Sequence, residues 1–185
     1  FSEEEFSLAY SGNKLVEVIK KLSIRFGIQN EDVFFKEVMA LSRSIYMNEL
    51  QPVIGVKKFL NSVNQNKLIG SNRDKHSLIQ GLKLTKLKTY FEENNIFSFD
   101  MVSQPKPDPE IFLKALEDSK IHSNETIVIE DSVIGVEAAV KAQIKVIAIT
   151  AGGHWINRSD NILKDAGAYF VASTFEQVIK VIEKL

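Results

Sequence analysis

The sequence has 185 residues, enough for one domain or for one domain with a small appendage. Hydrophobic residues make up 44% and charged residues 25%, which excludes a disordered or fibrous chain. The 23 Lys and Arg balance 24 Asp and Glu, and the net charge of −1 gives no support to nucleic acid or an anionic membrane as a partner. Without cysteine there is no disulfide scaffold, thiol nucleophile or Cys-ligated zinc, which fits the cytoplasmic location that we expect. No apolar run approaches the ~18–20 residues that span a bilayer, and no signal peptide is visible.

The first fifty residues predict helices with no strand between them. One helix is indicated by apolar residues at helical spacing that stop before Gly27. A second helix is predicted to start with Asn30 as its N-cap. Pro52 then breaks the pattern. We therefore expect two domains, a partial helical cap over residues 1–50 and a core over residues 51–185.

From residue 51 onward, helical stretches alternate with short apolar runs. The runs predict strands at residues 67–70, 98–103, 126–130, 145–150 and 169–172. Strands that alternate with helices favour an α/β fold with a Rossmann-like parallel sheet, covered by helices on both faces. In such sheets ligands bind at the carboxyl ends of the strands, so the residues that follow each strand are the candidates for function.

The first strand is followed by Ser71 and Asn72. A small hydroxyl and an amide, placed where backbone N–H groups and a helix N-terminus converge, can bind an anion. The alternative is an ordinary turn in which a polar side chain caps the next helix.

The second strand is followed by a segment that contains three of the four prolines, at positions 105, 107 and 109. Prolines restrict their own φ and the conformation of the preceding residue, so the backbone of Lys106 is held between two of them. Asp108 is a good N-cap for the helix behind it. The segment fits a fixed cation directed at an anionic substrate, and it fits equally well a stiff connection with a solvated lysine.

The third predicted strand ends in Glu130 and Asp131. Two adjacent carboxylates repel each other unless a cation neutralises them, and oxygen ligands in this position suit Mg²⁺. The alternative is that Asp131 or Ser132 only caps the next helix. Together the three segments would hold a phosphate against Mg²⁺, which describes a phosphoryl-transfer site that lacks its nucleophile.

These motifs resemble the haloacid dehalogenase superfamily of phosphohydrolases, in particular its subgroup of β-phosphoglucomutase and sugar-phosphate phosphatases. The resemblance is carried by Ser71-Asn72, by residues 106–112 and by Glu130-Asp131-Ser132 with the small residues that follow. It implies that Ser71 and the backbone of Asn72 bind phosphate, that Lys106 neutralises the phosphate and the nucleophile, and that Asp131 with Glu130 holds Mg²⁺. It also implies attack by an aspartate on phosphorus and hydrolysis of the aspartyl-phosphate by water.

The chain departs from this family in one major respect, because it contains no Asp-x-Asp motif. In the family this motif follows the central strand of the sheet and supplies the nucleophile and the acid/base. We expect it upstream of residue 1, and without that strand we expect a break in the sheet, low stability and no activity from the 185 residues alone. The loop from Asp100 to Lys106 is also shorter than is usual in the family.

The sequence thus predicts a Mg²⁺-dependent phosphatase for a small phosphorylated metabolite, acting as a monomer or weak dimer. A phosphosugar mutase and a non-catalytic phosphate-binding protein remain as alternatives. The roles of His154 and Trp155, which follow the fourth strand, stay open. Gly12 and Asn13 are candidates for substrate contact in the cap.

Overall fold

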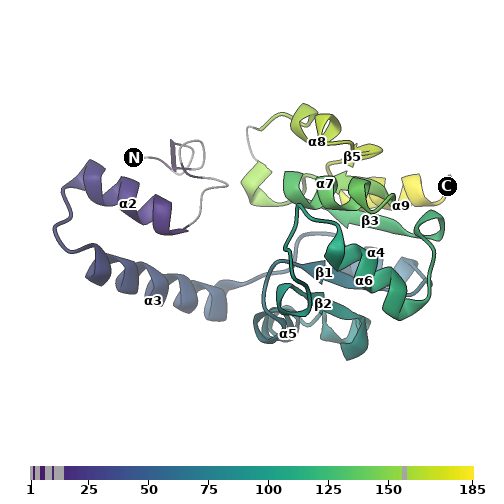
Figure 1. Cartoon of the computed structure of the whole chain (residues 1–185), viewed down its shortest axis with the longest axis horizontal. Coiled ribbons are helices and arrows are strands. Elements are labelled where there is room, and N and C mark those ends of the chain that lie inside the picture. Colours follow the sequence, from purple (N-terminus) through teal and green to yellow (C-terminus); the bar gives the residue numbers. More distant parts are fainter. Residues whose placement is uncertain (1, 3–4, 7–9, 11–14, 156–157) are drawn as a thin grey trace. The chain divides into compact units, whose positions relative to one another are not determined.

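The computed structural model describes residues 2, 5–6, 10, 15–155 and 158–185 (Figure 1). The chain divides into two compact units, Phe1–Leu50 and Gln51–Leu185. The division falls beside Pro52, where the sequence predicts the change from helices alone to alternating helices and strands. The predicted contact residues Gly12 and Asn13 lie outside the described residues.

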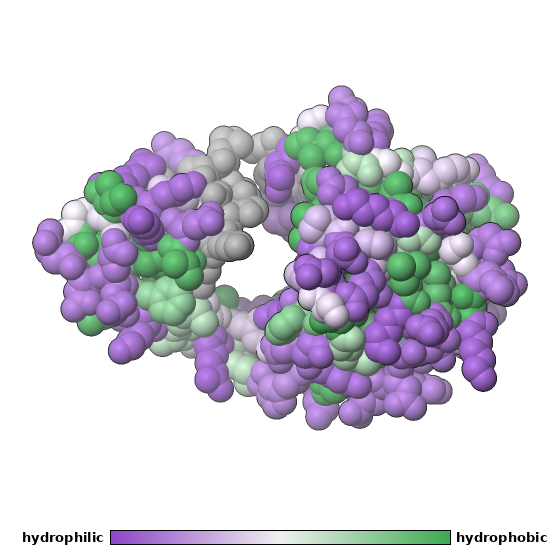
Figure 2. Space-filling model, viewed as in Figure 1, coloured by the Kyte–Doolittle hydropathy of each residue, from purple (hydrophilic) through white to green (hydrophobic). Residues whose placement is uncertain are grey.

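The first unit contains helices α2 (Leu15–Phe26) and α3 (Glu31–Glu49), which pack against each other. Helix α2 ends at Gly27, whose φ of +63° is a conformation that glycine adopts without strain. Helix α3 begins after Asn30, whose side chain accepts the N–H of Val33, so the predicted cap is confirmed. Large apolar side chains remain exposed on this unit (Figure 2), among them Val16, Ile24, Phe26, Leu41 and Ile45.

The second unit alternates helices and strands, which confirms the predicted α/β class. Its order is α4 (Val56–Ser62), β1 (Ile69–Ser71), α5 (Lys75–Leu84), β2 (Ile96–Ser98), α6 (Glu110–Ser119), β3 (Ile127–Glu130), α7 (Val133–Lys141), β4 (Lys145–Ile149), α8 (Asn161–Asp165), β5 (Phe170–Ala172) and α9 (Phe175–Ile182). All strand pairs are parallel. Right-handed crossovers through helices are the usual way to connect such strands.

The strands form two separate sheets, β1-β2 and β3-β4-β5 (Figure 1). Ser71 at the end of β1 pairs in register with Ser98 at the end of β2. Across the described residues, no strand joins β1 to β3. The break that the sequence predicts in the sheet is therefore present.

Strand β4 shows how helices cover both faces of the larger sheet. Val146 and Ala148 pack into an apolar cluster with residues of α6, α7 and α8, while Ile147 and Ile149 pack into another with residues of α4 and α9. Because successive side chains of a strand point to opposite faces, both faces of β4 are buried. A continuous apolar run is expected for such a strand.

The prediction of a strand at residues 98–103 is wrong. Strand β2 comprises Ile96–Ser98, and Phe99–Met101 form a 3-10 helix. Ile96 and Phe97 are 0% and 1% exposed whereas Phe99 is 44% exposed, so tertiary burial selects the earlier segment. The first strand begins two residues later and ends one residue later than predicted, and α6 begins at Glu110, two residues after the predicted N-cap Asp108. In the part of the chain that the structure describes, no helix is long and apolar enough to cross a membrane.

Candidate functional site

The loop after β1 is joined to the proline-rich loop by the side chain of Asn72. Its Nδ2 donates to the carbonyl of Lys106 at 3.0 Å, and its Oδ1 accepts the N–H of Lys106 at 2.9 Å. Both polar groups of the Lys106 backbone are therefore held by one amide. Ser71 Oγ accepts the N–H of Arg73 at 3.2 Å, which closes a tight turn at the end of β1.

Lys106 itself is buried, and its ammonium group forms an ion pair with the carboxylate of Glu130. The two side chains are 6% and 9% exposed, so water screens their attraction weakly. The ammonium also lies 4.9 Å from the centre of the Phe112 ring. A Cβ at Gly70 would come within 3.1 Å of that ring, so the end of β1 and helix α6 are closely packed beneath the lysine.

Glu130, the last residue of β3, turns back over the first turn of α7. Its Oε2 accepts the N–H groups of Asp131 and Ser132 at 3.1 and 3.3 Å, and the Ser132 hydroxyl at 3.0 Å. Ser132 caps α7 by accepting the N–H of Gly135 at 3.1 Å. A Cβ at Gly135 would lie 2.1 Å from the carboxyl carbon of Glu130, so only glycine leaves room for this arrangement. The carboxylate also benefits from the partial positive charge of the helix N-terminus.

Asp131 differs from its neighbour, because its side chain is 56% exposed. Partial desolvation by the surrounding protein raises the pKa of the Asp131 carboxyl, and the Glu130 carboxylate raises it further, whereas His154 and Lys106 oppose the shift. The nearest basic side chain is His154, whose Nε2 lies 3.6 Å from Oδ2. Apart from His154 and the backbone N–H of Asp131 itself, no described residue offers a donor to this carboxylate, so its exposed side is available to a cation.

The loop after β4 reaches the same residue. Trp155 is 6% exposed, and its Nε1 donates to the carbonyl oxygen of Asp131 at 2.7 Å. Nε2 of His154 lies 3.4 Å from that oxygen. The sequence left the roles of both residues open, and the structure places them on the predicted metal ligand. Their position after a buried strand was the signal that pointed to this edge of the sheet.

Sequence reasoning missed Glu110, the first residue of α6. Its carboxylate accepts the N–H of Ser103 at 2.9 Å and the N–H of Gln104 at 2.8 Å, and these hydrogen bonds lower the pKa of Glu110. Asp108 Oδ1 accepts the N–H of Glu110 at 3.0 Å, so the predicted capping side chain does bind the start of the helix. The loop that carries Lys106 is thus held at several points. An acid in the first turn of a predicted helix was the available signal.

The oxygen ligands at this edge fit Mg²⁺, although the fit relies on few protein groups. Among residues 15–155 and 158–185, no group of three or more His, Asp or Glu side chains is arranged to hold a metal. Mg²⁺ commonly uses one or two carboxylates and takes its other ligands from water and substrate phosphates. Asp131 offers an exposed carboxylate of this kind. Glu130 would have to release one of its present hydrogen-bond donors before it could bind the same ion.

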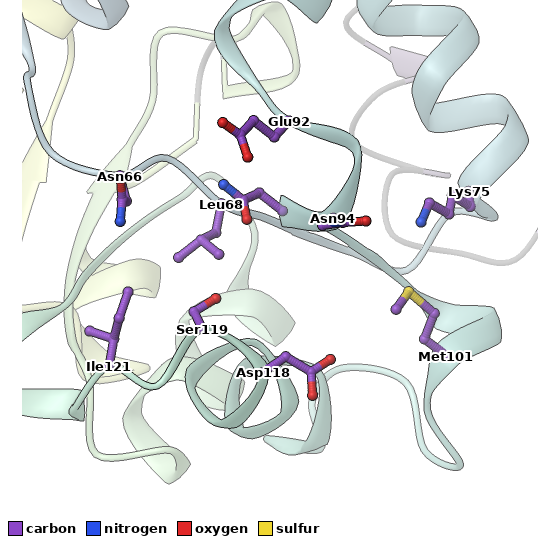
Figure 3. A pocket seen from close by; sticks show the side chains of 10 residues that line it. Asn66, Leu68, Lys75, Glu92, Asn94, Met101, Asp118, Ser119 and Ile121 are labelled. Carbon is purple, nitrogen blue, oxygen red and sulfur yellow. The ribbon is translucent and has the colours of Figure 1, made fainter.

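A surface pocket of about 440 Å³ lies elsewhere on the second unit (Figure 3). Its walls come from residues before β1 and before β2, from the end of α6, and from Lys75 and Met101. None of the five predicted site residues lines it. The chemistry therefore concentrates at the strand ends and not in this pocket.

A parallel α/β core that places a buried lysine beside adjacent carboxylates at its strand ends defines a class of phosphate-handling proteins. The sequence matches the family of haloacid dehalogenase-like hydrolases over residues 1–149, and the chain belongs to this family.

Some of the curated relatives are named as phosphatases. The chain is 28% identical over 171 residues to a phosphorylated carbohydrates phosphatase of Thermotoga maritima. The aligned region covers 91% of this chain and 75% of the relative. It is 24% identical over 156 residues to the 6-phosphogluconate phosphatase of Escherichia coli, which covers 82% and 68% respectively. A haloacid dehalogenase-like protein of unknown function from Agrobacterium tumefaciens has a TM-score of 0.86 at 26% identity, covering 100% of this chain and 83% of that chain. These similarities support an enzyme of the phosphatase type.

Proposed function

We propose that the protein is a Mg²⁺-dependent phosphatase that hydrolyses a small phosphorylated metabolite, most simply a sugar phosphate. The observation that carries the proposal is the buried Lys106–Glu130 pair with the exposed carboxylate of Asp131 beside it. A fixed cation next to a free carboxylate can place the two kinds of charge that a phosphate and its metal require. The names of the two curated relatives support phosphorylated carbohydrates as the substrate class.

In this proposal each loop at the strand ends has one task. The Ser71 hydroxyl and the backbone N–H of Asn72 bind oxygens of the phosphate, and Lys106 neutralises their charge. Asp131, with Glu130 as a predicted second ligand, holds Mg²⁺. When bound, Mg²⁺ supplies further neutralisation of the phosphoryl oxygens. The Asn72 side chain keeps the Lys106 backbone in place through its two hydrogen bonds.

The proposed reaction passes through an aspartyl-phosphate. An aspartate carboxylate attacks phosphorus, the bond to the leaving oxygen breaks, and an acid gives that oxygen a proton; water then hydrolyses the acyl phosphate. The 185 residues contain no Asp-x-Asp to supply these two groups, so the proposal requires them from sequence outside these residues. We further propose that the helical unit of residues 1–50 is part of a cap that selects the substrate.

Release of inorganic phosphate from a panel of sugar phosphates tests the proposal. We expect release by a protein that joins these residues to an Asp-x-Asp strand, dependence on Mg²⁺, and none from the 185 residues alone. Lys106→Met should abolish release, whereas Lys114→Met, which removes a partly exposed lysine of α6 paired with Asp118, should not.

Other outcomes would point to the alternatives. No release from any substrate by the joined protein would contradict the proposal, and phosphate binding without turnover would favour a non-catalytic protein. Interconversion of sugar phosphate isomers without loss of phosphate would identify a mutase.

A further inference from the structure

We infer that Trp155 is a positioning residue for Asp131, and that its indole presents the Asp131 carboxylate to the metal. The inference rests on the proposed Mg²⁺ site. Its basis is the 2.7 Å hydrogen bond from Trp155 Nε1 to the carbonyl oxygen of Asp131. This bond joins the loop after β4 to the end of β3.

The backbone of Asp131 is held on both sides. Its N–H donates to Glu130 Oε2 at 3.1 Å, and its carbonyl accepts from Trp155. The carboxylate, in contrast, is 56% exposed, and beyond the backbone N–H of Asp131 itself its neighbour is His154, whose Nε2 lies 3.6 Å from Oδ2. Because the backbone of Asp131 is already fixed, only its side-chain rotamer has to be ordered when the carboxylate binds a metal.

Trp155 can act as a rigid donor because it is itself immobilised. It is 6% exposed and packs in the apolar cluster that contains Leu163 of α8. Its backbone N–H donates to the carbonyl of Gly152 at 3.0 Å, and the guanidinium of Arg158 lies 4.7 Å from the centre of its ring. A buried indole N–H needs an acceptor, and here that acceptor is the carbonyl of the proposed metal ligand.

The test compares Mn²⁺ binding, measured by isothermal titration calorimetry, in the wild-type protein and two variants. Trp155→Phe keeps an aromatic ring in the core but removes the N–H donor, and we expect its Kd to rise about 10–100-fold, as for other groups that orient metal ligands. Leu163→Val disturbs the same cluster without touching Asp131, and its Kd should stay at the wild-type value. A folded Trp155→Phe protein with the wild-type Kd would overturn the inference. No binding by the wild type would overturn the metal site and the inference together.

A second measurement needs no change at Trp155. It is the only tryptophan of the 185 residues, so these residues give a single indole N–H signal in a ¹⁵N-correlated NMR spectrum. Mn²⁺ bound at Asp131 should broaden this signal strongly, and Asp131→Asn should remove the effect. A sharp signal at a Mn²⁺ concentration that saturates the calorimetric binding would refute the inference even if Trp155→Phe fails to fold. Phosphate release is not part of either readout, so failure here is distinguishable from failure of the proposed activity.

Discussion

The buried Lys106–Glu130 pair should respond unequally to removal of its two partners. The Lys106 ammonium has no other hydrogen-bond acceptor among the described residues. Glu130 keeps the N–H groups of Asp131 and Ser132, the Ser132 hydroxyl and the N-terminus of α7. We therefore expect Glu130→Gln to destabilise the protein more than Lys106→Met.

The size of the difference follows from what each variant leaves behind. A Gln side chain has one oxygen acceptor and one NH₂ donor in place of two oxygen acceptors. Its NH₂ group would therefore face either the Lys106 ammonium or the N–H groups of Asp131 and Ser132, all of which are donors. Leaving a buried charge without its partner costs about 3–5 kcal/mol. Lys106→Met instead removes one hydrogen bond to a charged group whose other donors remain, which costs about 1.5–3 kcal/mol. The first loss is a large fraction of the roughly 5–15 kcal/mol that stabilises a typical domain.

Urea unfolding followed by the fluorescence of Trp155 measures both variants, because the only tryptophan lies in the same unit as the pair. The double variant Lys106→Met/Glu130→Gln serves as the control, since it leaves no buried charge and should recover part of the loss of Glu130→Gln. If the two single variants lost equal unfolding free energy, or if Lys106→Met lost more, the N-terminus of α7 would not stabilise the charge of the Glu130 carboxylate.

Three further predictions use the same unfolding assay. Gly135→Ala should lower the unfolding free energy by about 3 kcal/mol or more, because its Cβ would displace the Glu130 carboxylate, whereas Gly153→Ala, with no atom within 4 Å of the added Cβ, should change it little. The pKa of Asp131 is raised in the folded state, so its ionised form destabilises the fold. Asp131→Asn should therefore be more stable than the wild type at pH 7, and this difference in unfolding free energy should shrink as the pH falls through the raised pKa. A stability difference that does not change with pH would show that ionisation of Asp131 is not its cause. Asn72→Ala removes two hydrogen bonds to the backbone of the buried lysine and should lower the unfolding free energy by about 1–3 kcal/mol. A loss below about 0.5 kcal/mol would show that these two bonds make no net contribution to stability.

Much of the fold could be predicted because the local patterns agree with tertiary burial. The buried strands β3 and β4 are continuous apolar runs, and the helices carry apolar residues at helical spacing with Asn30 as a recognisable cap. Strand β2 was misplaced because residues 98–103 alternate like a strand, while the burial of Ile96 and Phe97 depends on packing that the local pattern does not contain. The break between the two sheets followed from the missing Asp-x-Asp segment and not from any periodicity.

The candidate site was predictable only as a set of converging loops. Placing Asn72, Lys106 and Glu130 at the carboxyl ends of parallel strands was enough to bring them together. Their hydrogen bonds were not predictable, because they depend on side-chain directions that no spacing specifies. The bond from Trp155 crosses from one loop to another, so an aromatic residue at that position could not be distinguished from an ordinary core residue.

Glu130 and Asp131 show how one sheet edge gives two adjacent carboxylates different environments. Glu130 is enclosed by Lys106 and by donors of α7, an arrangement that requires the missing Cβ of Gly135. Asp131 has its backbone fixed by Glu130 and Trp155 while its own carboxylate stays exposed. The enclosed Glu130 carboxylate therefore stabilises the fold and the charge of Lys106. The pKa of the exposed Asp131 carboxyl is raised, because partial desolvation and the neighbouring Glu130 charge both disfavour its ionised form. If Asp131 binds Mg²⁺, the metal relieves that unfavourable charge, so metal binding and stability of the site should increase together.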